Sequence, residues 1–191
     1  MNNIIKYRNA EMRYWVDEFP DILIYDVFTK SYNIETQCEK RFKECRVAVE
    51  LYLHKNANNY GLLGIKYQPN TNVKNAVKVI INYVDKNKFK FEDNKINKSS
   101  KYIYVGLPKE FEEIIFDSVS KYISINNNIP AGEIDFTIAT NCEVGSSQEF
   151  YANLVELLLE ALVNLQKEVN MEKEDMDLFF TNIFNNSQWF A

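Results

Sequence analysis

Apolar side chains recur with a period of two between residues 47 and 54, and few folds are compatible with that pattern. The large aliphatic residues at every second position are Val47, Val49, Leu51 and Leu53, and they alternate with Ala48, Glu50, Tyr52 and His54. This period predicts a β-strand with one face buried and the other in solvent. A polar loop follows, and residues 60–67 then predict a second strand, so that the two strands form a hairpin.

The rest of the chain predicts more strands, followed by helices. Residues 77–83 and 134–138 alternate in the same way and predict two further strands. Pro108 is expected to begin a helix, because its missing N–H would be unpaired in a first turn anyway. The segment Ser-Ser-Gln-Glu at residues 146–149 is a capping box and predicts the start of a long apolar helix. With a last amphipathic helix over residues 172–186, the order of elements predicts an α+β sheet covered on one face.

The two ends of the chain give weaker patterns. Residues 21–28 predict one strand, with Pro20 at its boundary. We therefore expect an N-terminal extension with one strand over residues 1–45 and a main domain over residues 46–170. The tail, residues 171–191, is expected to form an amphipathic helix that packs on this domain, because its aromatic residues are too many for an exposed tail. Those aromatic residues are Phe179, Phe180, Phe184, Trp189 and Phe190.

Composition restricts the classes of function. The 191 residues include 22 basic and 27 acidic ones, a net charge of −5, which speaks against binding a bare phosphate backbone. Three cysteines without a CxxC pair and the single His54 cannot supply a tetrahedral zinc site, so no metal and no cofactor is expected. No signal core and no membrane-length apolar run is present, so we expect a cytoplasmic protein without membrane contact. The Asn- and Lys-rich composition is typical of AT-rich bacterial genomes.

Three segments resemble domain IV of elongation factor G and of the tetracycline-resistance ribosomal protection proteins. Residues 59–61 (Asn-Tyr-Gly) follow a polar hairpin loop, where the family has Gln-Tyr-Gly. Residues 107–111 (Leu-Pro-Lys-Glu-Phe) are similar to the family's proline-led entry into its first helix. Residues 143–147 (Glu-Val-Gly-Ser-Ser) are similar to its Asp-Val-Asp-Ser-Ser segment between a strand and the second helix. The resemblance spans residues 47–167 and keeps the order of the segments.

The resemblance implies a fold and a binding site. The implied fold is the one named for ribosomal protein S5 domain 2, a four-stranded sheet covered by two helices. In the family, the tips of two loops reach into the decoding site of the ribosome. The matching tip residues here are His54, Lys55 and Asn59 in one loop, and Asn141, Cys142 and Glu143 in the other.

This sequence also departs from the family. It has no G-x-x-x-x-G-K-[ST] loop, so a GTPase activity is not expected. Cys142 and Glu143 stand where the elongation factor has His and Asp. A first loop with Lys55 as its one basic residue is a poor electrostatic anchor for RNA.

No residue pattern predicts catalysis. His54 has no nucleophile that can be placed beside it, and an exposed loop histidine is the simpler interpretation. Cys142 precedes a helix N-terminus, which favours a thiolate, but Glu143 adjoins it and opposes that effect. We expect an ordinary thiol and a protein that is not an enzyme.

Residues 85–101 are lysine-rich and contain two phenylalanines. Lys86, Lys88, Phe89 and Lys90 are candidates for RNA binding by stacking and phosphate contact, although an edge strand protected by lysines has the same composition. Two hypotheses follow. One is a ribosome- or RNA-associated factor without GTPase activity. The other is a protein-binding module, such as an acidic regulator or immunity-type protein.

Overall fold

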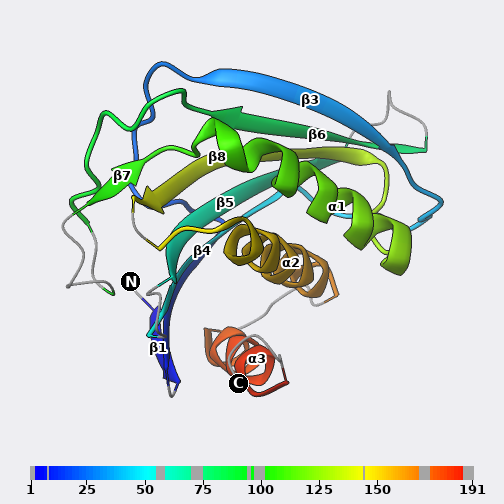
Figure 1. Ribbon diagram of the computed structural model, residues 1–191. Coiled ribbons are helices and arrows are strands. Elements are labelled where there is room, and N and C mark those ends of the chain that lie inside the picture. Colours follow the sequence, from blue (N-terminus) through cyan, green and yellow to red (C-terminus); the bar gives the residue numbers. More distant parts are fainter. Residues whose placement is uncertain are drawn as a thin grey trace.

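The chain forms one mixed sheet with helices on one face, as seen in a computed structural model (Figure 1). The structure describes residues 3–7, 9–54, 59–69, 75–93, 96, 102–143, 145–167 and 173–186. The strands in these ranges are β1 (Asn3–Tyr7), β2 (Ala10–Val16), β3 (Phe28–Glu35), β4 (Cys45–Leu53), β5 (Asn59–Pro69), β6 (Ala76–Tyr83), β7 (Ile103–Val105) and β8 (Gly132–Cys142). The α-helices are α1 (Glu112–Asn126), α2 (Gln148–Leu165) and α3 (Lys173–Asn186), and a 3₁₀ turn, η1 (Lys109–Phe111), leads into α1.

The order of strands across the sheet is β1-β2-β4-β5-β8-β6-β3, and β7 pairs with β8 beside this path. All neighbours are antiparallel except β6 and β8, which are parallel. The predicted four-stranded sheet covered by two helices is therefore wrong, because the described residues form eight strands and three α-helices. The difference arises mainly in the first 45 residues, whose β1 and β2 extend one edge of the sheet while β3 forms the other edge.

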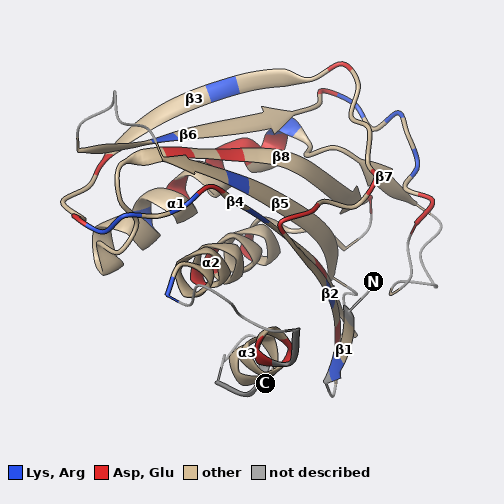
Figure 2. Ribbon diagram, turned by 180° about the vertical axis from the view of Figure 1, so that it is seen from behind, with Lys and Arg blue, Asp and Glu red and all other residues tan. Residues whose placement is uncertain are grey.

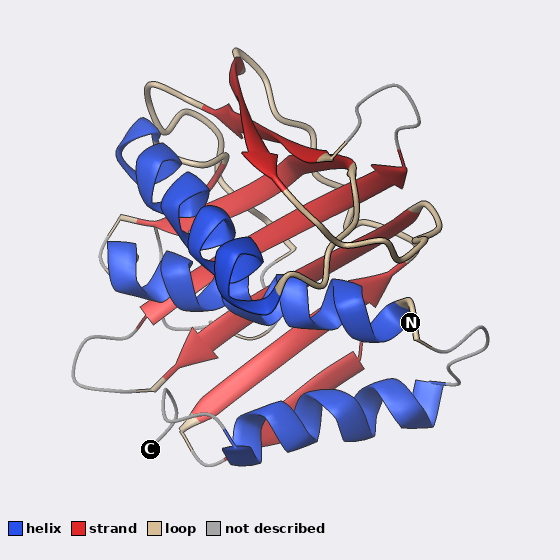
Figure 3. Ribbon diagram, turned by 90° about the vertical axis from the view of Figure 1, so that its right-hand side faces the viewer, coloured by secondary structure: helices blue, strands red, loops and turns tan. Residues whose placement is uncertain are grey.

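From β4 onward, the order of elements agrees with the predicted order except for the short β7, a strand that the sequence patterns did not predict. Strands β4, β5 and β6 come first, then the short β7, helix α1, strand β8 and helices α2 and α3. Figures 1 and 3 show the helices together on one side of the sheet, which we call the inner face. Helix α2 lies at the centre of this layer, and its residues Leu154, Leu158 and Leu162 are completely buried. In the described residues, the helices therefore form one layer on the inner face of an eight-stranded sheet.

The strand predicted at residues 21–28 is wrong, because residues 21–27 form an irregular segment before β3. The apolar residues of this segment are divided between two sides. Ile22 and Ile24 pack against the outer face of the sheet, while Leu23 and Tyr25 remain exposed. The segment thus has one buried side without being hydrogen-bonded into the sheet.

A second apolar cluster covers part of the outer face, opposite the helices. Its buried members come from five strands and from the loop before β7; they are Trp15, Ala48, Tyr52, Tyr60, Leu62, Phe91, Ile96, Ile103, Ile138 and Cys142. Strand β4 is consequently buried on both faces, and the half-exposed strand predicted at residues 47–53 is wrong in that respect. Its alternating residues Ala48, Glu50 and Tyr52 face this outer cluster and the polar groups beside it.

Helix α2 begins one residue later than the capping box predicts. Ser147 is its N-cap, and the Ser147 hydroxyl accepts a hydrogen bond from the Phe150 N–H at 3.1 Å. The Ser146 hydroxyl instead accepts the Cys142 N–H at 2.9 Å and donates to the Tyr60 carbonyl at 2.8 Å. Ser146 therefore connects the end of β8 to the start of β5, which makes it unavailable as a cap.

We expect Gly64→Ala to destabilise the protein by about 1–3 kcal/mol through overpacking. A Cβ at Gly64 would lie 2.4 Å from Cγ1 and 2.8 Å from Cδ1 of Ile138, and 3.0 Å from Cβ of Ala48. Urea unfolding of Gly64→Ala, Ile138→Ala and the double variant measures the coupling between the two sites. The double variant should lose less stability than the sum of the single losses, and strict additivity would contradict the proposed clash.

Candidate functional site

An open, largely apolar hollow of about 500 Å³ lies where β3 begins and β6 ends. We call it the aromatic hollow. Its apolar lining consists of Ile24, Tyr25, Val27, Phe28, Val84, Phe89 and Val105. The residues come from three separate stretches of chain, namely the segment before β3, the loop after β6 and strand β7.

The aromatic side chains of this hollow are exposed to an unusual degree. Tyr25, Phe28 and Phe89 keep 54%, 49% and 45% of their surface accessible. Tyr25 and Phe89 contact each other with ring centroids 5.2 Å apart, and Phe28 stacks on Tyr83 at 5.8 Å. Large apolar side chains that gather in one exposed patch mark interaction surfaces on soluble proteins. The ring contacts also hold these side chains in place before any ligand arrives.

Charges of both signs surround the aromatic hollow. Asp26, Asp85, Lys86 and Lys88 complete its lining. Lys88 is neutralised by Asp26, whose carboxylate lies 2.6 Å from the Lys88 ammonium group. Lys86 makes no ion pair with the residues described. Figure 2 shows both red and blue segments in the loops near β7, without a continuous blue band.

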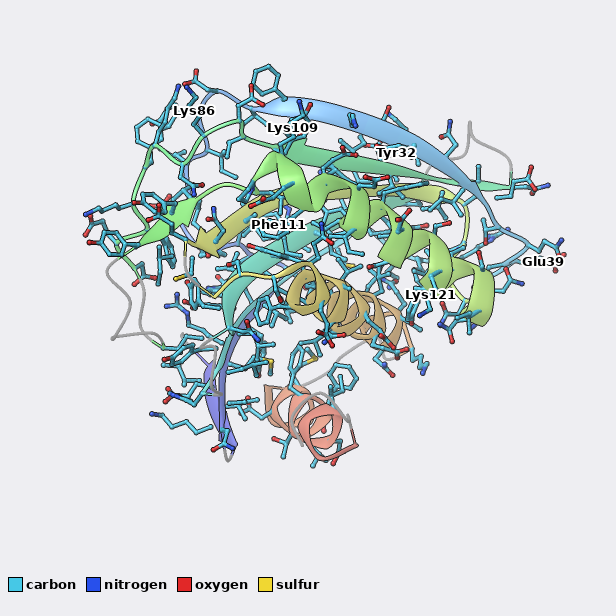
Figure 4. All side chains as sticks on the ribbon, in the orientation of Figure 1. Tyr32, Glu39, Lys86, Lys109, Phe111 and Lys121 are labelled. Atoms are coloured by element: carbon cyan, nitrogen blue, oxygen red, sulfur yellow. The ribbon has the colours of Figure 1, made fainter. Side chains whose placement is uncertain are left out.

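A second hollow, of about 540 Å³, shares Val84, Asp85 and Lys86 with the first. The residues 141–143 predicted as one loop tip line it, together with Pro108 and the 3₁₀ turn η1. Lys86 and Lys109 both lie at this end of the molecule (Figure 4). The structure thus brings the candidates Asn141, Cys142 and Glu143 together with Lys86.

Several polar groups of the second hollow are already used in holding the fold together. The Asn87 side-chain amide donates to Oδ1 of Asn141 at 3.2 Å, and the Asn141 amide donates to Oδ1 of Asn87 at 3.0 Å. The Asn141 amide also donates to the Gly106 carbonyl at 2.9 Å. Cys142 is buried in the outer cluster, and the Glu143 N–H donates to the Tyr102 carbonyl. This arrangement provides structural ties between β7, β8 and the loop after β6.

The other predicted tip lies at the same end of the sheet but outside both hollows. Gly61 pairs with Asn141, so Asn59, at the start of β5, is near the end of β8. His54 is exposed, with Nε2 at 3.3 Å from Oε1 of Glu11 and its ring 4.3 Å from the ring of Tyr52. Lys55 lies outside the described residues.

Within the described part of the lysine-rich segment, the four RNA-binding candidates do not all gather into one patch. Lys86 lines both hollows, and Lys88 and Phe89 line only the aromatic one. Lys90 forms an isolated bridge with Tyr104 and lines neither hollow. Of these four candidates, the structure brings Lys86, Lys88 and Phe89 together. The sequence analysis did not predict Tyr25 and Phe28 as site residues. The signal that could have identified them is the run of apolar residues just before β3.

A buried polar network crosses the outer face and was also missed. Arg13 Nε donates to Oε2 of Glu50 at 2.6 Å, and both side chains are fully buried. The Tyr60 hydroxyl donates to Oε1 of Glu50 at 2.8 Å, and Asp93 accepts from Arg13 Nη1 at 3.2 Å. Burial raises the pKa of the Glu50 carboxyl, an effect that Arg13 and the Tyr60 hydrogen bond oppose. Neither of the two hollows described above is lined by Arg13 or Glu50, and the network connects β2, β4 and β5 within the sheet.

Neither a metal centre nor a membrane-spanning helix is found in the part of the chain that the structure describes. Comparisons of the chain with protein-family models, with curated proteins and with solved structures found no match.

Proposed function

We propose that this chain is a non-enzymatic protein-binding module and that the aromatic hollow is its binding surface. The observation that carries the proposal is the exposure of Tyr25, Phe28 and Phe89 around one concave surface. Protein interfaces have such a centre of aromatic side chains, surrounded by a polar rim. Asp26, Lys86 and Lys88 supply a rim of that kind.

The charge at this surface supports a protein partner more than a nucleic acid. The two acids and two lysines of the aromatic hollow cancel, and the whole chain carries a net charge of −5. Nucleic-acid binding depends on a surplus of positive charge that releases counterions. Lys88 is not available for that purpose while it is paired with Asp26.

A ribosome- or RNA-associated role is the second candidate. It is favoured by exposed rings next to lysines, because bases stack on aromatic side chains while lysines contact phosphates. The domain IV resemblance also favours it, although the four-stranded fold that the resemblance implied is wrong. The site for this role would be the same aromatic hollow, with Lys86, Lys88, Phe89 and Lys90 as contacts.

Peptides selected from a random-peptide library on the wild-type chain test the proposed function. We expect Tyr25→Ala and Phe89→Ala each to weaken binding of the selected peptides by about tenfold or more, since buried aromatic anchors dominate interface energies. Fluorescence polarisation measures the affinities. The matched control is Ile125→Ala, which removes an exposed apolar side chain on α1 and should leave binding unchanged.

A labelled oligouridylate probe, measured with the same variants, separates the two candidates. Binding that survives physiological salt, weakens in Phe89→Ala and weakens further in Lys86→Glu would favour the RNA-associated role instead. If the selected peptides bind Tyr25→Ala and Phe89→Ala as tightly as the wild type, the aromatic hollow is not the protein-binding surface.

A further inference from the structure

We propose that the partner binds as an extended segment that adds a strand to the outer edge of β3 and places an apolar side chain in the aromatic hollow. This inference rests on the proposed protein-binding function and specifies its mode. Binding by strand addition uses main-chain hydrogen bonds for affinity and side-chain pockets for specificity. Both requirements meet at β3, because Phe28 is the first residue of the strand and also lines the hollow.

Strand β3 is the edge of the sheet beyond β6. It pairs with β6 on one side, and no strand of the described residues pairs with its other side. Figure 1 shows β3 as the outermost strand, running above α1 without a covering helix. Most of its residues are exposed, including Thr29, Ser31 and Asn33.

The register shows which backbone groups point away from the sheet. The Thr36 N–H donates to the Asn75 carbonyl at 3.0 Å, and these two residues continue the pairing of Glu35 with Ala76. In an antiparallel ladder, hydrogen-bonded and non-hydrogen-bonded pairs alternate. Every second residue of β3, counted back from Thr36, therefore directs its backbone N–H and C=O groups toward β6. These residues are Phe28, Lys30, Tyr32 and Ile34.

Thr29, Ser31 and Asn33 consequently direct their N–H and C=O groups outward. Among the described residues, none forms a hydrogen bond with these outward backbone groups. They provide donors and acceptors at alternate positions along a strand of eight residues, about 27 Å at 3.4 Å per residue. A partner segment of ordinary strand length can pair with all of them.

The usual protections of an edge strand are missing from β3. It contains no proline, and its register with β6 runs unbroken from Phe28 to Glu35. Proline, bulges and free lysines are the common devices against edge-to-edge pairing. Its lysine, Lys30, is directed to α1, where its ammonium group lies 2.5 Å from Glu112.

The inner side of β3 is fixed, which prepares the edge for binding. Glu112 also accepts a hydrogen bond from the Tyr32 hydroxyl, and the Tyr32 ring stacks on Phe116 with centroids 4.0 Å apart. Figure 4 shows Tyr32 on β3 near α1. A strand that is already held in its bound conformation loses little conformational entropy when a partner pairs with it.

The aromatic hollow indicates a different protein and not a second copy of this chain. Two β3 strands could pair antiparallel about a twofold axis at Tyr32. Residues 36–39 of the second copy would then lie opposite residues 25–28 of the first, which line the hollow. Residues 36–39 are Thr, Gln, Cys and Glu, and they include no large apolar side chain. The partner segment instead carries one large apolar or aromatic residue for the hollow. It also carries an acidic residue near it for Lys86, which has no ion pair among the described residues.

Proline substitutions at the edge test the mode of binding. Ser31→Pro and Asn33→Pro remove outward N–H groups that make no bond within the sheet, so the fold should tolerate them. We expect each to weaken the library-selected peptides by about tenfold, whereas Ser31→Ala, which keeps the N–H, should bind as the wild type does. Circular dichroism and urea unfolding verify that the proline variants are folded.

N-methylation of the selected peptides gives a second measurement that does not depend on the fold of the variants. A paired strand directs only every second N–H toward its neighbour. Methyl groups on the backbone nitrogens that face β3 should therefore abolish binding. Methyl groups on the nitrogens between them should leave binding intact. Sensitivity to neither set would overturn strand addition.

The outcomes separate this inference from the proposed function. Loss of binding in Tyr25→Ala and Phe89→Ala with full binding in Ser31→Pro would retain the function and overturn the mode. Unchanged binding in Tyr25→Ala, Phe89→Ala and both proline variants would overturn the proposed function and the proposed mode of binding. A dimer in sedimentation equilibrium that dissociates in Ser31→Pro would assign the edge to a second copy and overturn the choice of partner.

Discussion

Arg13→Ala is expected to destabilise the protein by about 3–5 kcal/mol, the largest effect that we expect from a single substitution outside the helices. Arg13 on β2 lies directly opposite Glu50 on β4, and both side chains have no accessible surface. Removing the guanidinium group leaves the Glu50 carboxylate buried with the Tyr60 hydroxyl as its remaining hydrogen-bond donor. An unpaired buried charge is costly because the interior cannot solvate it.

The pH dependence of this variant has a definite sign. Burial raises the pKa of the Glu50 carboxyl, and removing Arg13 removes the main charge that opposes the rise. A carboxyl whose folded pKa lies above its unfolded pKa contributes stability at low pH that is lost as pH rises through the folded pKa. The loss of stability in Arg13→Ala relative to the wild type should therefore shrink as pH falls below the pKa of Glu50.

Urea unfolding at several pH values measures both effects. Arg46→Ala is the matched control, because Arg46 lies on β4 but is exposed. The double variant Arg13→Met with Glu50→Leu replaces the pair by apolar side chains and should recover most of the lost stability. A loss in Arg13→Ala no larger than in Arg46→Ala would show that the buried pair is not stabilising the sheet.

Phe180→Ala is expected to lower stability by about 3–5 kcal/mol and to release α3 from the sheet. Phe180 has no accessible surface, and its ring lies 4.5 Å from the ring of Tyr14 on β2. The Tyr14 hydroxyl donates to Oδ1 of Asp177 at 2.6 Å, which fixes the same helix turn. The Phe180 ring and the Tyr14–Asp177 hydrogen bond thus help to attach α3 next to the β1 edge of the sheet, together with the buried Met176.

Hydrogen exchange distinguishes release of α3 from global unfolding. Amides of α3 should lose protection in Phe180→Ala while those of α2 keep it, since weakly attached elements open locally. Leu178→Ala is the control on the same helix, because Leu178 is 60% exposed. Equal protection of α3 in Phe180→Ala and Leu178→Ala would contradict the anchoring role of Phe180.

The sequence by itself determined the central part of the fold. The period of two at residues 47–53 and 77–83 identified β4 and β6, and Pro108 identified the helical entry that leads through η1 into α1. These patterns are local, because they follow from the geometry of a strand or helix that has one buried side. Local patterns were sufficient for the order of elements from β4 to α3 apart from the short β7.

Only the tertiary structure decided how large the sheet is and which faces are buried. The pattern at residues 21–28 predicted a strand, yet its buried side packs on the outer face without pairing, and the true edge strand begins at Phe28. Glu50 looked like a solvent-facing residue of a half-buried strand until Arg13, 37 positions away, was placed opposite it.

The candidate site shows the same division. The sequence singled out Lys86, Lys88 and Phe89 as a group, but the aromatic hollow also needs Tyr25 and Phe28 from a distant segment. The role of Lys88 depends on Asp26, which is 62 positions away. Periodicity indicates that the two sides of a segment differ in their surroundings. It does not indicate what covers each side or which charge neutralises another, because these depend on chain segments that meet only when the whole sheet is assembled.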